Sequence, residues 1–271
     1  MLATKHGKLA CIAPSLEQAG LAVEAVAVDT DTLGTFTGEI PRTAPPLDTA
    51  VAKARLGMAV TGNPIGLASE GSIGPHPMAP WGIFDRELVV LVDDRRGIVV
   101  AGVAASADIT TIARTVRPGD DLDRLVAGAD LPAHAVIVIP NVGPPHPVRK
   151  GLRHVSEIAA AVTVCAASSA DAAAQVQTDL RAHVCPSRRR VMRDAAEDLA
   201  ARLLTRCPSC RSPGVGKTGV VVGLPCGWCG ADADLVRAEV HSCPACAHRE
   251  ERPVVPEGTT ADPGRCPRCN P

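Results

Sequence analysis

The segment ELVVLVDDRRGIVVAGVAAS (87–106) holds two valine-rich runs on either side of a short charged stretch. The runs at 87–94 and 97–106 flank Arg95 and Arg96, a pattern typical of two antiparallel strands joined by a tight turn. We therefore expect a β-hairpin here, and the segments around it show what kind of sheet it joins.

Strand-like and helix-like segments alternate on both sides of the hairpin. Residues 22–28, 63–69 and 133–140 are apolar runs typical of strands, and residues 47–60 have the i, i+4 spacing of a helix. The segment 9–13 fits either a strand or the start of a helix that contains Pro14. This alternation predicts an α/β domain over residues 1–204, with a mixed sheet and flanking helices.

A last helix is predicted from about Arg188 to Leu204, with Ser187 as its cap. It runs directly into Cys207, so we expect a rigid joint to the segment that follows and no swinging linker. The apolar stripe that should pack on the first domain consists of Val191, Ala195, Leu199 and Leu203.

The composition limits the class of protein. The chain has 271 residues, 46% of them hydrophobic, a formal net charge of -1, no Tyr, two Phe and two Trp. The core must therefore be aliphatic, and a surface that stacks bases or attracts a polyanion is not expected, so a nucleic-acid partner is disfavoured. No apolar stretch reaches the roughly 18 residues of a membrane span, and the first residues lack the apolar core of a secretion signal. We expect a cytoplasmic protein with reduced cysteines and no membrane contact.

Eight of the eleven cysteines lie after residue 206, in four CxxC pairs. CxxC turns at this spacing predict two zinc ribbons over residues 205–271, each Zn²⁺ held by four cysteines and structural because no coordination position stays open. Sequential pairing is the preferred arrangement, although a cross-braced one, first pair with third and second with fourth, also fits the spacing. The preferred sets are Cys207, Cys210, Cys226 and Cys229 for one ion, and Cys243, Cys246, Cys266 and Cys269 for the other.

The segment GLASEGSIGPHP (66–77) brings one acid, Glu70, directly after an apolar strand. Glycines and prolines follow, so we expect Glu70 at the mouth of the strand and a turn over 71–76 that contains Ser72 and His76. Such a turn fits either a simple chain reversal or a metal or phosphate site.

Other polar clusters could meet Glu70. Carboxylates bind hard divalent cations, and lysines, arginines and glycine-turn amides bind phosphate oxygens. On this chemistry we expect Glu70 and Glu39 to hold Mg²⁺ as the catalytic pair. The ligand-binding candidates are Lys8, Lys53, Ser72, His76, Asp179 and Arg181. Taken singly, each of these residues also fits a solvated turn.

The order of these clusters resembles that of the inosine/xanthosine triphosphate pyrophosphatase superfamily, which hydrolyses non-canonical purine nucleotides. The similar motifs are LATKHGK (2–8), with His6 where asparagine is usual, AVAKAR (50–55) and GLASEGSIG (66–74). The resemblance implies a phosphate-binding role for Lys8 and Lys53 and a metal-binding role for Glu70.

The whole chain also resembles a bacterial family of unknown function that carries zinc ribbons. The motifs are GTFTGEI (34–40), ASEGSIGPHP (68–77), TDLRA (178–182) and DPGRCPRCNP (262–271). This second resemblance implies no activity.

Two functions follow. The first is a Mg²⁺-dependent hydrolase, or a binder, of a phosphorylated small molecule such as a non-canonical nucleoside triphosphate, with a structural zinc-ribbon tail. The second is a non-catalytic adaptor whose ribbons bind a protein or nucleic acid. The sequence leaves the oligomeric state open.

Overall fold

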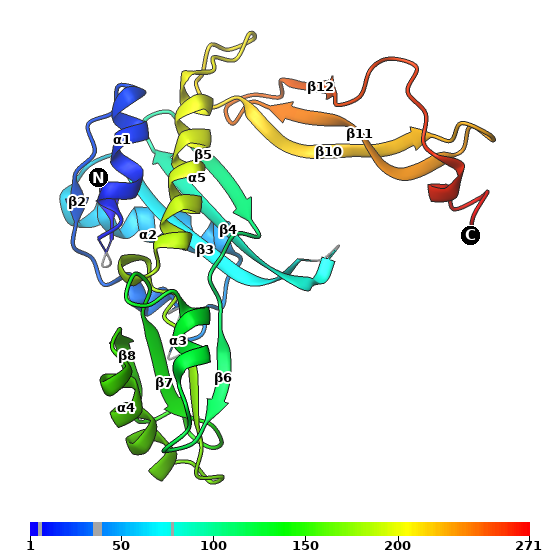
Figure 1. The fold of residues 1–271 in the computed structure, drawn as a ribbon. Coiled ribbons are helices and arrows are strands. Elements are labelled where there is room, and N and C mark those ends of the chain that lie inside the picture. The colour runs from blue at the N-terminus through cyan, green and yellow to red at the C-terminus, as the bar shows by residue number, and fades with distance from the viewer. Residues whose placement is uncertain (5–6, 35–39, 77–78) are drawn as a thin grey trace.

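The computed structural model describes residues 1–4, 7–34, 40–76 and 79–271 and has the predicted mixed α/β fold (Figure 1). A five-stranded sheet forms its centre, in the order β2-β1-β3-β4-β5. The strands β1 (Leu2–Ala3), β2 (Ala25–Val26) and β3 (Ile65–His76) are parallel. The hairpin strands β4 (Ala79–Asp93) and β5 (Ile98–Ser106) continue the sheet in antiparallel pairing, which confirms the hairpin and the mixed sheet.

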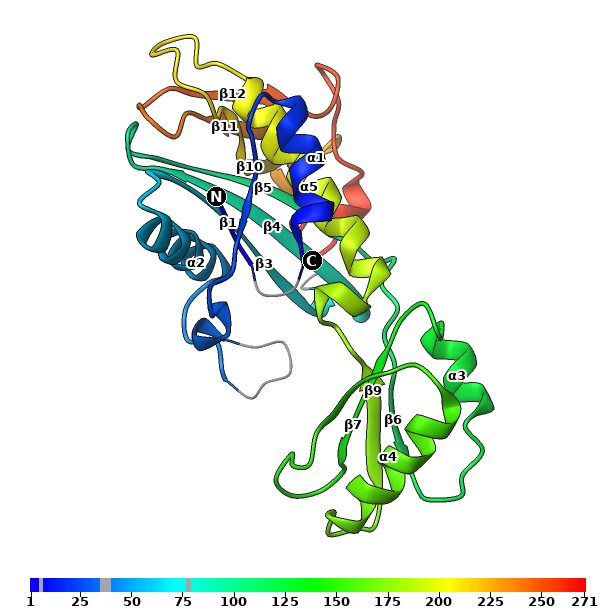
Figure 2. The ribbon, with the colours of Figure 1, turned by 90° about the vertical axis from the view of Figure 1, so that its left-hand side faces the viewer.

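Helices cover both faces of this sheet (Figure 2). The helices α1 (Leu9–Gln18) and α5 (Pro186–Leu204) lie on one face, and α2 (Pro46–Thr61) lies on the other. Alternate residues of each strand point to opposite faces. Val89 and Leu91 of β4 therefore join the core under α1 and α5, whereas Val90 and Val92 join the core under α2.

Three local predictions were wrong. The strand expected over 22–28 is only Ala25–Val26. The expected turn over 71–76 is extended strand, because β3 continues to His76 and pairs with β4 along that length. Ser187 lies inside α5 and does not cap it, since the helix begins at Pro186 with Cys185 as the N-cap residue. The segment with two possible conformations is helix α1, which contains Pro14.

The chain between β5 and α5 forms a second sheet, in the order β6-β9-β7-β8. Its strands are β6 (Ala113–Val116), β7 (Val136–Pro140), β8 (Arg149–Leu152) and β9 (Ala174–Thr178), all antiparallel to their neighbours. The helices α3 (Asp123–Ala129) and α4 (Val155–Ala167) pack on it around an apolar cluster of its own. Single 3-10 turns occur at Thr30–Leu33, Ala182–Val184 and Pro263–Arg265.

The third sheet is an arm that leaves the end of α5 and extends away from the centre (Figure 1). It consists of the antiparallel strands β10 (Gly216–Pro225), β11 (Asp232–Ser242) and β12 (Arg249–Pro253). Within the described residues, no helix combines the length and the apolar character needed to cross a bilayer.

The predicted apolar stripe of α5 is confirmed. Val191, Ala195 and Leu199 are buried, and Leu203 packs against the same core. The closest approach is to Gly102 of β5, where a Cβ atom would overlap the backbone of α5 at Ala195 and Leu199. The helix axis can lie this close to the sheet only because residue 102 has no side chain.

We predict that Gly102→Ala destabilises the protein by about 1–3 kcal/mol or more, because the added methyl group must push α5 away from the sheet. Gly74→Ala is the matched control: it lies in β3 of the same sheet, and a Cβ there meets nothing within 4 Å. Urea denaturation of both variants measures the difference. Equal midpoints would contradict the close contact between α5 and β5.

Candidate functional site

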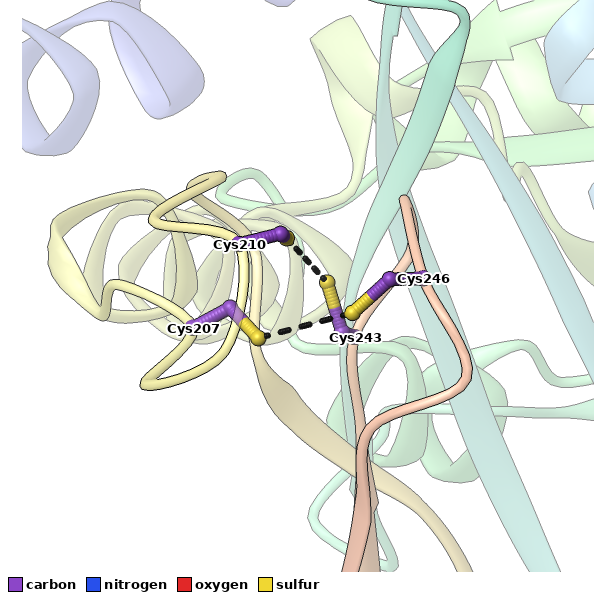
Figure 3. A group of neighbouring side chains, drawn as sticks. All are labelled: Cys207, Cys210, Cys243 and Cys246. Atoms are coloured by element: carbon purple, nitrogen blue, oxygen red, sulfur yellow. Dashed lines mark hydrogen bonds between the residues drawn. The ribbon is translucent and has the colours of Figure 1, made fainter.

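The eight cysteines of the arm form two groups of four whose sulfur atoms could each hold a metal ion. Within each group all four Sγ atoms lie within 4.8 Å of one another. The first group contains Cys207, Cys210, Cys243 and Cys246 (Figure 3). The second contains Cys226, Cys229, Cys266 and Cys269.

The sulfur–sulfur distances fit a tetrahedral ion. Cys207 and Cys246 are 3.7 Å apart, and Cys210 and Cys243 are 3.6 Å apart (Figure 3). In the second group, the Sγ atoms of Cys226 and Cys269 are 3.8 Å apart, and those of Cys229 and Cys266 are also 3.8 Å apart. Four sulfurs at the usual 2.3 Å from a tetrahedral Zn²⁺ would be separated by about 3.8 Å. Each group therefore has the spacing of a four-thiolate metal site.

The sequential pairing predicted from spacing was wrong, and the arrangement is cross-braced. The first CxxC pair precedes β10 and the third follows β11. Because these two strands are antiparallel, the chain returns to the end from which it started, so the first and third pairs meet there. The second pair, in the turn between β10 and β11, lies at the opposite end with the fourth. The spacing of the CxxC pairs in the sequence does not show which pairs meet in space.

Backbone N–H groups of the CxxC turns also lower the pKa of two of the thiols. Burial opposes ionisation of Cys207, but backbone N–H groups of Cys210 and Ser209 lower its pKa to about 6. Backbone N–H groups of Cys229 and Trp228 lower the pKa of Cys226 to about 7. Since the thiolate is the form that binds a metal, these backbone N–H groups favour the coordinating state of Cys207 and Cys226.

A polar cluster lies beside the end of β1, where Glu70 of β3 meets basic side chains from two segments. Glu70 is buried, and its Oε2 accepts a hydrogen bond from Lys53 Nζ of α2 at 2.7 Å. Its Oε1 accepts one from Arg42 at 3.0 Å, and Arg42 also donates to the Gly71 carbonyl and to Ser72 Oγ. A metal at Glu70 would therefore have to displace one of these cations.

Lys8 lies at the start of α1, next to the same part of β3. Its Nζ donates to Ser69 Oγ at 3.0 Å and to the Ser69 carbonyl at 3.3 Å. Burial, followed by the nearby charge of Arg188, lowers the pKa of Lys8 to about 8, although Glu87 and Glu70 oppose the shift. Lys8 thus remains a cation near neutral pH at an energetic cost.

The other face of the sheet carries a second buried ion pair, between Glu87 of β4 and Arg188 of α5. Arg188 also donates to the Leu180 carbonyl at 2.7 Å. Glu87 lies opposite Gly71, and a Cβ atom there would overlap the Glu87 carboxylate. Asp85, two residues before Glu87, is fully buried as well. Burial first, and then the Glu87 charge, raise the pKa of Asp85 to about 8.

The structure brings together three of the predicted site residues, Lys8, Lys53 and Glu70, and joins Ser72 to them through Arg42. Asp179 and Arg181 form an ion pair of their own at 2.6 Å, in the loop whose Leu180 contacts Arg188. Glu39 lies outside the described residues, and so does the side chain of His76. The roles predicted for these residues stay predictions.

The sequence analysis missed Asp85 and Glu87. The signal was present, because alternation along β4 puts both on the same face as Val89 and Leu91, which are core residues. Near the charged start of the predicted strand, however, two acids look like solvent-exposed residues.

A protein-family model described as a domain of unknown function, DUF6671, matches residues 53–271, so the chain belongs to this family. The match includes Lys53, Glu70, Glu87, Arg188 and all eight cysteines of the arm. No curated protein and no solved structure matches the chain.

The cross-braced arrangement predicts how metal content responds to serine substitutions in two CxxC pairs. Replacing Cys207, Cys210, Cys243 and Cys246 removes one complete group and should leave one metal ion per chain. Replacing Cys207, Cys210, Cys226 and Cys229 leaves each group with two cysteines and should leave none. Elemental analysis after dialysis against a chelator measures both values. Sequential pairing would give the opposite result for the two variants.

The lowered pKa of Lys8 predicts a specific change of stability with pH. Between about pH 8 and pH 10.5 the unfolded chain holds a proton on this amine that the folded chain does not. Unfolding then takes up a proton, so the contribution of Lys8 to the free energy of unfolding rises with pH in this range. Urea denaturation of wild type and Lys8→Met at several pH values isolates the contribution. A difference between them that is constant across the range would contradict the lowered pKa.

Proposed function

We propose that this member of the DUF6671 family binds a phosphorylated small molecule at the polar cluster beside β1 and β3 and, with a divalent cation, hydrolyses it. The observation that carries the proposal is the excess of positive charge there. Lys8, Arg42, Lys53 and Arg188 supply four cations. Two acidic side chains pair with them, Glu70 on the face covered by α2 and Glu87 on the opposite face. The third acid, Asp85, has a pKa of about 8 and is largely protonated at neutral pH. A multivalent anion would balance this charge.

The topology supports the same location. The β1-α1-β2 connection runs over one face of the sheet, and the β2-α2-β3 connection runs over the other. Ligands of open α/β sheets bind outside the carboxyl ends of the strands at such a change of direction. Lys8 follows the carboxyl end of β1, and Glu70 lies in β3 three residues after Leu67, which pairs with β1. Fold-level analogy of this kind indicates a place and names no substrate.

The chemistry proposed for the site is cleavage of a phosphoanhydride bond. Lys8 and Lys53 would hold phosphate oxygens, and Glu70 would keep Lys53 and Arg42 in position. A bound Mg²⁺ would supply stabilisation of the charge that develops on the leaving phosphate and would activate a water molecule. A non-canonical nucleoside triphosphate is the substrate that the resemblance of the N-terminal motifs suggests.

For the arm we propose that the two groups bind Zn²⁺ and that both ions are structural. Four cysteines close each coordination sphere, and thiolates in a tetrahedron are the usual ligands of this metal. The described arm offers little other stabilisation, because its two apolar clusters are small.

The second candidate function, an adaptor, is favoured by one observation on the arm. Trp228, in the turn of the second cysteine group, is 81% exposed, and Val220 and Val222 of β10 are about half exposed. An exposed tryptophan on a rigid turn is a common anchor of protein interfaces. An adaptor needs Trp228 and does not need Lys53, so the two functions can be separated by mutation.

We predict that Lys53→Met weakens binding of a phosphorylated probe by at least about tenfold, because it removes a charge-assisted hydrogen bond. Glu70→Gln removes the charge that holds Lys53 and Arg42 in position and should reduce Mg²⁺-dependent phosphate release at least about tenfold. Arg55→Gln is the control, since Arg55 lies on the same helix but is exposed and pairs with Asp94. The measurements are calorimetric binding and phosphate release with nucleoside triphosphates and pyrophosphate. If wild type binds none of these probes, or Lys53→Met binds them equally well, the adaptor is the better reading.

A further inference from the structure

Asp85 and Glu87 stand out as a pair of buried acids in β4. Both are completely inaccessible to solvent, and they point to the same face of the sheet, two residues apart. Among the described residues, Arg188 forms an ion pair with one of them, through Oε1 of Glu87. One guanidinium serves two carboxyl groups, and the second acid, Asp85, has a side-chain hydrogen bond to Glu87 through a proton that a cation would displace.

Three of the four carboxyl oxygens lack a basic or neutral donor. Within the part of the chain that the structure describes, no N–H or hydroxyl group donates to either oxygen of Asp85 or to Oε2 of Glu87. Buried acceptors are nearly always satisfied, and an exception calls for an explanation such as an ion. Leaving carboxylate oxygens unpaired in the core is among the most costly arrangements in a protein.

The backbone is also arranged to admit these oxygens. Gly71 of β3 lies directly opposite Glu87, and any side chain there would overlap the Glu87 carboxylate and the Arg188 guanidinium. The glycine therefore lets the carboxylate approach the neighbouring strand, beside Glu70. The absence of a side chain at residue 71 is thus a second observation, independent of the hydrogen bonds, that fixes the position of the Glu87 carboxylate.

We propose that Asp85 and Glu87 form a binding site for one hard divalent cation, Mg²⁺ or Mn²⁺. Such cations prefer carboxylate oxygens, and Mg²⁺ is commonly held by one or two carboxylates with water and phosphate oxygens in its other positions. The three orphaned oxygens supply that partial set. The site is separate from the two cysteine groups, whose soft sulfur ligands suit a different metal.

The inference deepens the proposed function without depending on it. Glu87 and Arg188 act electrostatically on Lys8, so the cation and the phosphate-binding lysine would share one cluster. The cation of the proposed hydrolysis would then be held by Asp85 and Glu87, and Glu70 would remain the anchor of Lys53 and Arg42.

The test is Mn²⁺ binding to the full chain with its cysteine sites loaded with zinc, followed by electron paramagnetic resonance of the free ion. We expect one Mn²⁺ per chain that Mg²⁺ displaces. Asp85→Asn and Glu87→Gln should each weaken binding at least tenfold, because each removes a carboxyl group that the cation would bind in place of its proton. The control Asp234→Asn changes an exposed acid of the arm and should bind as wild type does.

If one variant is too unstable for the binding experiment, thermal denaturation with and without Mg²⁺ gives a second measurement of metal binding. Wild type should melt at a higher temperature with Mg²⁺, and the Asp85→Asn protein should not. Wild type that fails to bind millimolar Mn²⁺, or Asp85→Asn and Glu87→Gln proteins that bind as tightly as wild type, would overturn the proposal and leave the two acids sharing a proton.

Lys53→Met separates this proposal from the proposed function. It should lose pyrophosphate binding and keep Mn²⁺ binding. If wild type binds Mn²⁺ at Asp85 and Glu87 but no phosphorylated probe, the metal site stands and the proposed function fails.

Discussion

The contact of α5 with the five-stranded sheet is the constraint on which the other parts of the molecule depend. It is possible only because Gly102 lets the helix backbone touch β5. From this one helix, Ser187 contacts His134, just before β7 of the second sheet, at 2.9 Å, Arg188 pairs with Glu87, and the last turn leads to Cys207. A shift of α5 would therefore move the second sheet, the polar cluster and the arm together.

The polar cluster costs folding free energy, because it buries charged side chains next to an aliphatic core. Lys53, Glu70, Asp85, Glu87 and Arg188 are all buried. Replacing buried ion pairs by apolar residues is often neutral or stabilising, so pairing alone does not explain why the charges are there. Perturbed and unsatisfied titratable groups that gather around one end of a sheet, here on both of its faces, are more typical of a binding site than of a structural core.

Sequence patterns predicted those elements whose signal is local. The hairpin of 87–106, helix α2 and the buried stripe of α5 follow from periodicity, and the four CxxC pairs follow from residue type. Convergence of Lys8, Lys53 and Glu70 was expected from the order of their motifs. The extension of β3 to His76 was not, because glycine and proline usually interrupt strands, whereas here pairing with β4 outweighs that preference. The pairing of the cysteines and the burial of Asp85 depend on contacts between distant segments, which local patterns do not encode.

Cross-bracing explains how an arm with so little apolar core can keep its shape. Strand β10 runs from the first cysteine group to the second, β11 returns, and β12 runs out again. An ion at each end would therefore tie the start of the ribbon to its middle and its turn to its last residues. Ten residues of β10 put the two groups roughly 30 Å apart. Sequential sites would join only neighbouring segments, whereas ions at the cross-braced sites would hold all three strands in register.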